Sequence, residues 1–249
     1  MNHPDTPEEV YFFGTCLADA VFPEAAMAAM RLIERLGFKV IYPLDQGCCG
    51  QPAYNSGFPA EARALALKQI EAFSGSGRPV VVPSGSCAGM MKLHYPKLFE
   101  GHPRYFDALS FSERVVELCE FLHAARPEGY EDSGPPVTVT WHSSCHAQRE
   151  TGSTGAAKAI LRGLPGVTLA ELSREWECCG FGGTFSVKRP EVSAAMVRDK
   201  VEDIRASGAS VVLTADCGCL LNITGAAARM GVPVRGLHLA QFLLERTRG

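Results

Sequence analysis

The sequence of 249 residues lacks the features of several large classes of protein. Its net charge is only -3 and it has no run of lysine and arginine, so nothing in it indicates a nucleic-acid partner. Its apolar runs are short, and none approaches the roughly 20 residues that a membrane-spanning helix needs. The polar and acidic residues 1–10 do not have the pattern of a signal peptide. These absences predict a cytoplasmic protein that does not itself insert into a membrane.

The sequence also lacks the glycine-rich loops that bind nucleotides. The segment CGFGGTF, residues 179–185, does not have the G-x-G-x-x-G spacing, and a GxxxxGK[ST] loop is absent. We therefore assign no flavin or nicotinamide site. The CxxCxxCxxxCP run typical of ferredoxins is absent too, so the chain carries no ferredoxin-type module of its own.

Cysteine, in contrast, is plentiful, with 10 residues in the chain. In a reducing compartment this number favours metal ligands or redox groups over disulfides. Two CCG triplets, at residues 48–50 and 178–180, place cysteines side by side. Neighbouring cysteines make a poor disulfide with each other because the short ring is strained. Adjacent thiols can instead bind different atoms of one cluster, which a single metal ion would rarely need.

The cysteines belong to two matched copies of one pattern. The strand-like segments EEVYFFGTC and VTVTWHSSC end at Cys16 and Cys145. From these cysteines to the following pair there are 31 and 32 intervening residues. From each pair to the next cysteine, Cys87 or Cys219, there are 37 and 39. Spacings this similar indicate an internal duplication.

The secondary-structure signals repeat in step with the cysteines. Amphipathic patterns predict helices over 23–37 and 155–166 and again over 59–73 and 190–208, with strands at 38–43, 167–172, 78–87 and 209–219. Each copy thus reads β–α–β–loop–α–β, which is typical of a parallel sheet covered by helices. We predict an α/β protein of two tandem pseudo-symmetric domains, 1–125 and 137–249, each with a CCG motif and joined by a Pro- and Gly-rich linker at 126–136.

The carboxyl ends of parallel strands share one edge of a sheet, where ligands usually bind. The first copy should therefore gather its thiols at one point, and the second copy should do the same at the matching edge. Four thiolates suit either an iron–sulfur cluster, most simply a 4Fe–4S cubane, or a zinc ion. The expected ligands of the iron or zinc are Cys16, Cys48, Cys49 and Cys87 in the first copy and Cys145, Cys178, Cys179 and Cys219 in the second.

The duplicated pattern resembles the CCG cysteine-rich domain found in heterodisulfide reductase and in the iron–sulfur subunits of glycolate oxidase and anaerobic glycerol-3-phosphate dehydrogenase. More closely, CCGQPAYNSG, VPSGSCAGM, HSSCH, CCGFGGTFSVK and ADCGCLLNI together resemble the lactate utilization protein A family. This resemblance implies a cytoplasmic electron-transfer subunit of an oxidoreductase system that converts L-lactate to pyruvate. It also implies two partners, a ferredoxin-type iron–sulfur subunit and a third lactate-utilization subunit.

The chain departs from this pattern at two positions. In heterodisulfide reductase each CCG motif ends in CxxC and gives five ligands to a noncubane 4Fe–4S cluster. Here Ser84 stands where the earlier cysteine of the first copy would be, and Asp216 stands at the equivalent place in the second copy. Four ligands remain in the first copy. In the second copy Cys217 lies one residue later, and we weigh it equally as a fifth ligand and as a thiol that binds nothing.

Several other residues are weaker candidates. His146 and Arg149 could donate hydrogen bonds to a cluster or hold a small carboxylate, or could simply lie in a solvated helix cap. Strand alternation turns His142 away from the side of Ser143. Gln51, Tyr54 and Asn55 could line a cleft or shape a turn. His94 and His238 fall in helix-like segments and are expected at the surface or in the core, and Cys119 is expected in the core.

Three alternatives to the iron–sulfur electron carrier stay open. A zinc-stabilised scaffold could use the same thiolates to dock its partners without moving electrons. A thiol–disulfide redox subunit could use reactive thiolates near helix ends. Finally, the chain could serve a glycolate oxidase-type complex, because that system uses the same domain.

Overall fold

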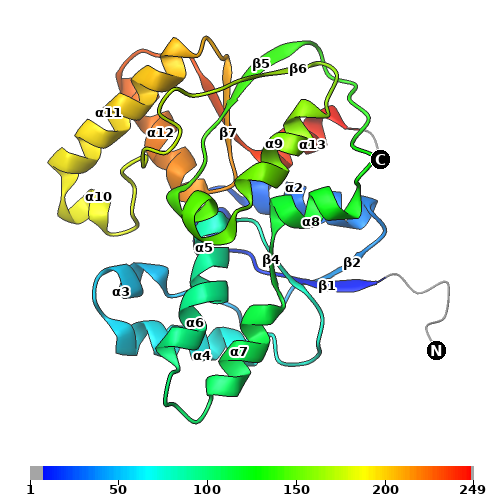
Figure 1. The fold of residues 1–249 in the computed structure, drawn as a ribbon, viewed down its shortest axis with the longest axis vertical. Coiled ribbons are helices and arrows are strands. Elements are labelled where there is room, and N and C mark those ends of the chain that lie inside the picture. Colours follow the sequence, from blue (N-terminus) through cyan, green and yellow to red (C-terminus); the bar gives the residue numbers. More distant parts are fainter. Residues whose placement is uncertain (1–7, 248–249) are drawn as a thin grey trace.

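The computed structural model describes residues 8–247 and contains two four-stranded parallel sheets (Figure 1). The first sheet has the order β2-β1-β3-β4 and the second the order β6-β5-β7-β8. The α/β prediction is confirmed, and the identical strand orders show the duplication in space. The strands are β1 (Glu9–Phe12), β2 (Lys39–Ile41), β3 (Val80–Val82), β4 (Val115–Glu117), β5 (Val137–Trp141), β6 (Val167–Ala170), β7 (Val211–Thr214) and β8 (Arg235–His238).

Helices connect successive strands in both halves. The first half contains α1 (Cys16–Ala20), α2 (Pro23–Arg35), α3 (Gln51–Asn55), α4 (Pro59–Ala72), α5 (Gly85–Gly89), the π-helical turn η1 (Met90–His94), α6 (Tyr95–Leu98), α7 (Tyr105–Glu113) and α8 (Leu118–Ala125). The second half contains the π-helical turn η2 (Ala147–Thr151), α9 (Thr154–Arg162), α10 (Phe185–Lys188), α11 (Pro190–Ala206), α12 (Cys217–Arg229) and α13 (Leu239–Arg246).

Four helices, α2, α4, α9 and α11, form where the sequence predicts them, whereas the predicted strands at 78–87 and 209–219 were too long, because α5 begins at Gly85 and α12 at Cys217. In α2 a stripe that includes Ala25, Ala29 and Ile33 is buried, as expected for an amphipathic helix with one face on a core. Pro23 stands at its first turn, where a missing N–H is tolerated. Gly37 follows the helix with a φ of 89°, a left-handed conformation that stops it.

The fourth strand of each sheet was not predicted. The sequence pattern predicted a helix over 113–124 and placed His238 in a helix-like segment. In the structure, β4 and β8 occupy the first part of these stretches. Three- and four-residue strands are too short to show alternation beside the strong pattern of the helix that follows. The helix starts carry a clearer signal, because the side chains of Glu117 and His238 cap the N–H groups of Cys119 and Ala240.

The core is continuous between the two halves. One cluster of buried side chains includes Phe12 and Val81 from the first sheet and Trp141 and Leu213 from the second. Helix α2 packs against α13 and α8 packs against α9, and Figure 1 shows these four helices side by side. The division into two domains stays a prediction, because each half has its own sheet while the helices between the sheets share one core.

The segment 126–136 is held against the second half. The Asp132 carboxylate accepts hydrogen bonds from the Arg246 guanidinium and from the Gly166 N–H, both at 2.8 Å. Asp132 also pairs with Thr247 in an isolated β-bridge. This connection is therefore fixed at its centre by the last helix.

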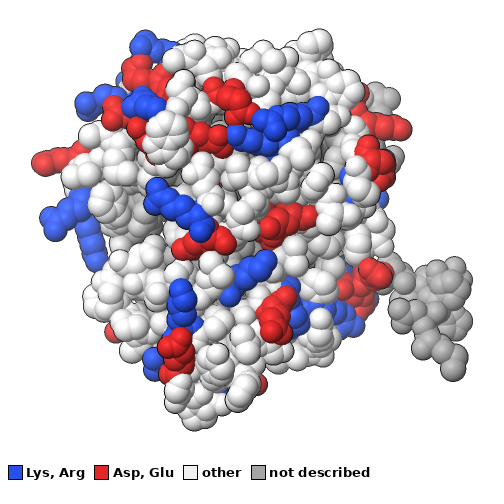
Figure 2. Space-filling view, in the orientation of Figure 1, with Lys and Arg blue, Asp and Glu red and all other residues white. Residues whose placement is uncertain are grey.

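The surface carries both signs of charge. Figure 2 shows lysine and arginine interspersed with aspartate and glutamate over the face that it presents. The ion pairs of the chain include Arg235 with Glu245 at 2.8 Å. Among residues 8–247, none of the helices combines the length and the apolar character needed to cross a bilayer.

Candidate functional site

The first set of thiols follows the carboxyl ends of β1, β2 and β3, where Cys16 begins α1, Cys48 and Cys49 lie in the loop before α3, and Cys87 lies in α5. Strand β1 lies between β2 and β3, and all three strands are parallel. Their carboxyl ends therefore meet at one edge of the sheet, where the thiols come together. The Cys16 thiol donates to Cys48 with the sulfur atoms 4.0 Å apart, and the Cys49 and Cys87 sulfur atoms lie 3.4 Å apart. A further thiol contact joins Cys48 to Cys49. The four side chains thus form one continuous group.

The second set repeats this arrangement at the carboxyl ends of β5, β6 and β7. Thiol contacts run from Cys145 to Cys178, from Cys178 to Cys179, and from Cys179 to Cys219. The order of contacts is the same as in the first half. The structure therefore brings all eight cysteines into two groups of four, as the spacing predicted; that they bind a metal stays a prediction.

One thiol in each group is strongly acidified. Hydrogen bonds from Cys16 and Cys49 lower the pKa of Cys48 to about 3, and hydrogen bonds from Cys145 and Cys179 lower the pKa of Cys178 to about 2. The N–H groups of Gly50 and Gly180 also donate to these two sulfur atoms, at 3.5 and 3.3 Å. Each group thus holds a thiolate, which is the form that binds metals.

The glycine of each CCG triplet is required by the backbone. Gly50 and Gly180 have φ values of 86° and 82°, which L-residues with a side chain rarely adopt. A Cβ atom at Gly180 would also lie 2.8 Å from the Ser193 carbonyl oxygen. Each turn directs the thiols of the two preceding cysteines and the N–H of its own glycine into one small region.

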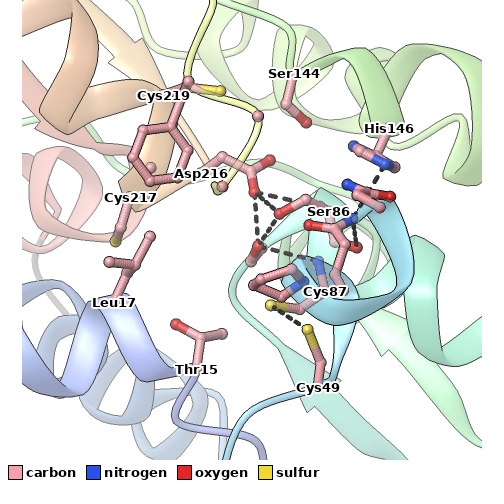
Figure 3. Close-up of a pocket in the computed structure, with 18 of the residues that line it drawn as sticks. Thr15, Leu17, Cys49, Ser86, Cys87, Ser144, His146, Asp216, Cys217 and Cys219 are labelled. Atoms are coloured by element: carbon pink, nitrogen blue, oxygen red, sulfur yellow. Dashed lines mark hydrogen bonds between the residues drawn. The ribbon is translucent and has the colours of Figure 1, made fainter. Parts of the chain in front are cut away.

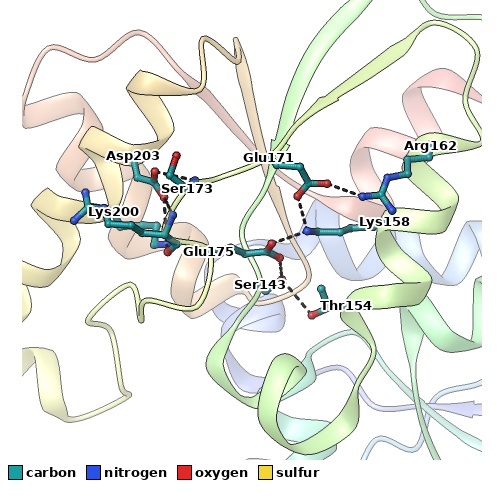
Figure 4. Close-up of polar contacts among 10 residues, drawn as sticks. Ser143, Thr154, Lys158, Arg162, Glu171, Ser173, Glu175, Lys200 and Asp203 are labelled. Atoms are coloured by element: carbon teal, nitrogen blue, oxygen red, sulfur yellow. Dashed lines mark hydrogen bonds and ion pairs between the residues drawn. The ribbon is translucent and has the colours of Figure 1, made fainter.

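Polar contacts fix the loop that carries Cys178 and Cys179 (Figure 4). Lys158 pairs with Glu171 at 2.6 Å and with Glu175 at 2.5 Å, while the Ser143 hydroxyl donates to Glu175. On the other side of the loop the Asp203 carboxylate accepts from the backbone N–H groups of residues 173 and 174. The loop from β6 to the cysteine pair is therefore anchored along its whole length.

The two thiol groups line a single cavity of about 90 Å³ between the halves (Figure 3). Thr15, Gln51, Asn55, Ser144 and His146 contribute polar atoms to its wall. Both halves thus present their cysteines to each other. The sequence predicted the two groups but not that they would face one space.

Ser84 and Asp216, the two departures from the five-cysteine pattern, touch each other. The Ser84 hydroxyl donates to Asp216 Oδ1 at 2.6 Å, and Ser86 donates to the same oxygen from its hydroxyl and its N–H at 2.5 and 3.2 Å. Figure 3 shows this cluster in the cavity wall. The positions where a fifth sulfur would stand are therefore used to join the halves.

Cys217 and Cys119 differ from the other eight cysteines. Burial raises the pKa of Cys217 to about 12, so its thiol stays protonated. Figure 3 shows its side chain on the side of the cavity where Leu17 lies, apart from Cys219. Cys119 is 1% exposed within the shared core, which confirms the expectation for it. Whether Cys217 binds a metal stays a prediction.

His146 and Gln51 meet in the cavity across the two halves. His146 Nε2 lies 3.0 Å from Gln51 Nε2, and His146 Nδ1 lies 3.5 Å from the Cys145 sulfur. Asn55 also lines the cavity, whereas Tyr54 stacks on His94 with ring centroids 4.8 Å apart. The proposed roles of these side chains toward a cluster or a carboxylate stay predictions.

Two of the remaining candidates, His94 and His238, make contacts between the halves. His94 pairs with Glu150 at 3.0 Å. His238 is buried, and its Nε2 lies within hydrogen-bond distance of the carbonyl oxygens of Pro83 and Ala215. Arg149 lies in η2, outside the lining of the cavity. His94 and His238 thus have structural partners, as expected of surface or core histidines.

His142 is the functional candidate that sequence reasoning placed least well. Its side chain is fully buried, and one of its ring nitrogens lies within 4.8 Å of the Cys179 and Cys219 sulfur atoms. Burial lowers the pKa of His142 to about 4, so the imidazole is neutral. The signal in the sequence was its position three residues before Cys145, since the side chain at that place faces the loop after β6.

The donor set fits a thiolate-bound metal centre. Each group offers four sulfur atoms, one of them already a thiolate with a backbone N–H directed at it, as is usual around metal-bound sulfur. Sulfur donors suit iron–sulfur clusters and zinc, not the hard cations that prefer oxygen. The structure thus shows cysteines near one another in an arrangement suited to a metal or a cluster.

Comparison with known proteins supports the duplication. The family model of the cysteine-rich domain, CCG, matches residues 10–92 and 139–224, one match in each half. The likeness to a hypothetical protein from Helicobacter pylori, with a TM-score of 0.70 at 10% identity, covers 97% of this chain and 49% of that one. At this identity the likeness shows the fold alone.

Relatives of similar length share much more of the sequence. A lactate utilization protein A from Geobacillus kaustophilus is 42% identical over 241 residues, which cover 96% of this chain and 99% of that protein. Proteins of the same name from Exiguobacterium and Bacillus subtilis are each 41% identical, over 95% and 96% of this chain and 97% and 100% of their own lengths.

Proposed function

The chain belongs to the lactate utilization protein A family of CCG cysteine-rich domain proteins, and we propose that it is an iron–sulfur electron-transfer subunit of a system that oxidises L-lactate to pyruvate. Oxidation of lactate releases two electrons and two protons. Iron–sulfur clusters supply one-electron redox chemistry, with potentials set by their surroundings. This chain's residues would bind such clusters, shield them and relay electrons to an acceptor.

The observation that carries the proposal is the pair of four-thiol groups on one cavity. A subunit that relays electrons needs redox centres close to each other, and the two groups face the same small space. The adjacent cysteines of each CCG triplet favour a cluster over a single ion, because neighbouring thiolates can bind different iron atoms. The most economical centre for four thiolates is a 4Fe–4S cubane in each half.

The proposed system includes two further subunits. The chain has no ferredoxin-type run, so a ferredoxin-type iron–sulfur partner would accept or deliver the electrons. A third lactate-utilization subunit would complete the system. We place the assembly in the cytoplasm, where a reducing environment keeps thiols available for metals.

A zinc-stabilised scaffold is the second candidate, and the sulfur spacing favours it. Two thiolates on one tetrahedral zinc with bonds of about 2.3 Å lie about 3.8 Å apart. The sulfur separations of 4.0 and 3.4 Å in the first half lie on either side of this value. In this case the chain would hold its partners together without carrying electrons.

Metal analysis of the full chain separates the two. We expect anaerobic purification to give a brown protein with about 4 Fe and 4 sulfides per occupied group. The Cys179→Ala variant should lose the iron of the second group, while Cys119→Ala, which removes a core thiol outside both groups, should keep all of it. A colourless protein with stoichiometric zinc and no redox transition would establish the scaffold instead.

A further inference from the structure

The two thiol groups differ at one position of the strand that precedes them. His142 and Phe13 each stand three residues before the first cysteine of their half. The backbone N–H of His142 donates to the Leu213 carbonyl oxygen at 2.8 Å, and that of Phe13 donates to the Val81 carbonyl oxygen at 2.9 Å. The two side chains are therefore equivalent, and both are fully buried. The first half has a phenyl ring at the place where the second half has an imidazole.

The imidazole of His142 has no hydrogen-bond partner in the described part of the chain. Neither Nδ1 nor Nε2 makes a hydrogen bond within residues 8–247, although the side chain is 0% exposed. A buried polar group without a partner is rare in proteins and calls for an explanation, one of which is a bound ion. By contrast, the equally buried His238 is satisfied by two carbonyl oxygens and by the N–H group that it caps.

One ring nitrogen, Cys179 Sγ and Cys219 Sγ all lie within 4.8 Å of one another. This spacing lets three donors reach one metal atom with bonds of about 2.0–2.3 Å after small side-chain adjustments. A neutral imidazole is the form that binds metals. No sulfur stands at Asp216, so the second half lacks the fifth thiolate of the five-cysteine pattern.

We propose that His142 is a ligand of the metal centre in the second half, bound to the same metal atom as Cys179 or Cys219. The second half then offers five donors, four sulfur and one nitrogen, whereas the first half offers four sulfur atoms and a phenyl ring. The two centres are chemically distinct, and only the second contains nitrogen. This inference rests on the proposed function only in that the second group holds a metal.

Pulsed EPR on the reduced full-length protein tests this ligand directly. With iron bound, we expect a nitrogen coupling from a directly bound imidazole, and its frequency should change when the protein is grown with ¹⁵N-labelled histidine. His142→Phe, which copies the first half, should lose this coupling. His146→Phe is the matched control, because it removes the imidazole beside Cys145 and should keep the coupling.

Other outcomes are equally informative. If iron is present and the histidine label changes nothing, or the coupling survives in His142→Phe, the inference is wrong while the iron–sulfur proposal stands. If the protein holds zinc, zinc X-ray absorption should show one nitrogen among the sulfur ligands of the second group, and its absence would overturn the inference. A protein that binds neither iron nor zinc would overturn both proposals.

A conservative variant adds a readout that a purely structural histidine would not move. His142→Cys supplies a negatively charged fifth donor, so we expect the second centre to remain and its reduction potential to fall below that of the wild type. An unchanged potential in His142→Cys, measured by redox titration followed by EPR, would contradict direct ligation.

Discussion

Gly180 shows how a single residue sets the geometry of a thiol group. Its positive φ of 82° and the 2.8 Å approach to the Ser193 carbonyl leave no place for a side chain. We expect Gly180→Ala to lower the free energy of unfolding by about 1–3 kcal/mol and to reduce the metal content of the second group. Urea unfolding and metal quantitation measure the two effects.

Gly208 provides the matched control for this prediction. Its φ of 70° is also positive, but a Cβ atom there would have nothing within 4 Å. Gly208→Ala should therefore show the backbone strain alone, about 1–2 kcal/mol, with the full metal content. Equal metal content in both variants would show that the turn does not position the thiols.

Cys217 gives the second prediction at this scale. Because its thiol is protonated and lies on the Leu17 side of the cavity, Cys217→Ala should retain the metal of the second group. Cys219→Ala, two residues later on the same helix, should lose it. Metal analysis of the two variants decides the matter, and loss of metal from both would make Cys217 the fifth ligand.

At the scale of helices and strands, most of the fold could be predicted from the sequence. The four predicted helices and the first three strands of each half have periodic patterns with clear stops, such as Gly37 after α2, whereas the 13-residue α12 was not predicted. Strands β4 and β8 could not be recognised, because each continues directly into the helix that follows, at Leu118 and Leu239, with no turn residue to separate the two patterns. Missing these two strands did not change the predicted site, because neither strand carries a cysteine of the thiol groups.

The candidate site was predictable only in part, for a physical reason. Sequence spacing reports which residues follow the carboxyl ends of parallel strands, and it therefore placed the eight cysteines correctly relative to one another. It carries no information on how the two sheets meet. The contact of Ser84 with Asp216 and the shared cavity depend on that meeting. The position of His142 depends on which sheet face the β6 loop covers.

The segment 126–136 yields a pH-dependent prediction. Although burial raises the pKa of Asp132, hydrogen bonds from Arg246, Gly134 and Gly166 outweigh it and hold the pKa below the ordinary 3.8. The folded pKa lies below the unfolded one, so this stabilisation is present above the unfolded pKa and is lost as the pH falls through the folded pKa. Asp132→Asn should be less stable at pH 7 by about 1.5–3 kcal/mol.

Urea unfolding across pH checks this sign. The difference between the wild type and Asp132→Asn should shrink as the pH falls below about 4, because the wild-type carboxyl then becomes neutral as well. A difference that stays constant down to pH 2 would mean that shape, and not charge, fixes this segment to Arg246.

At the scale of the whole molecule, Asp216 joins the halves beside the thiol groups. It accepts three hydrogen bonds from Ser84 and Ser86 in a buried place. A double-mutant cycle of Ser84→Ala and Asp216→Ala should give a coupling energy of about 1–3 kcal/mol in urea unfolding. A value near zero would show that the two residues touch without stabilising the contact.

The same contact has a functional consequence. If it holds the two thiol groups at a fixed separation, the double variant should keep its metal but transfer electrons between the centres more slowly. In this view Ser84 and Asp216, which stand where the five-cysteine pattern has sulfur, set the distance between the two centres and do not bind metal themselves.

The central claim is that each half holds an iron–sulfur centre on its four thiols. The most direct measurement is iron, sulfide and zinc quantitation of the anaerobically purified full chain, with EPR of the reduced form. The account predicts about 8 Fe per chain, which is two cubanes, and two distinguishable paramagnetic signals. A colourless chain that contains zinc in place of iron, with no signal on reduction, would contradict it.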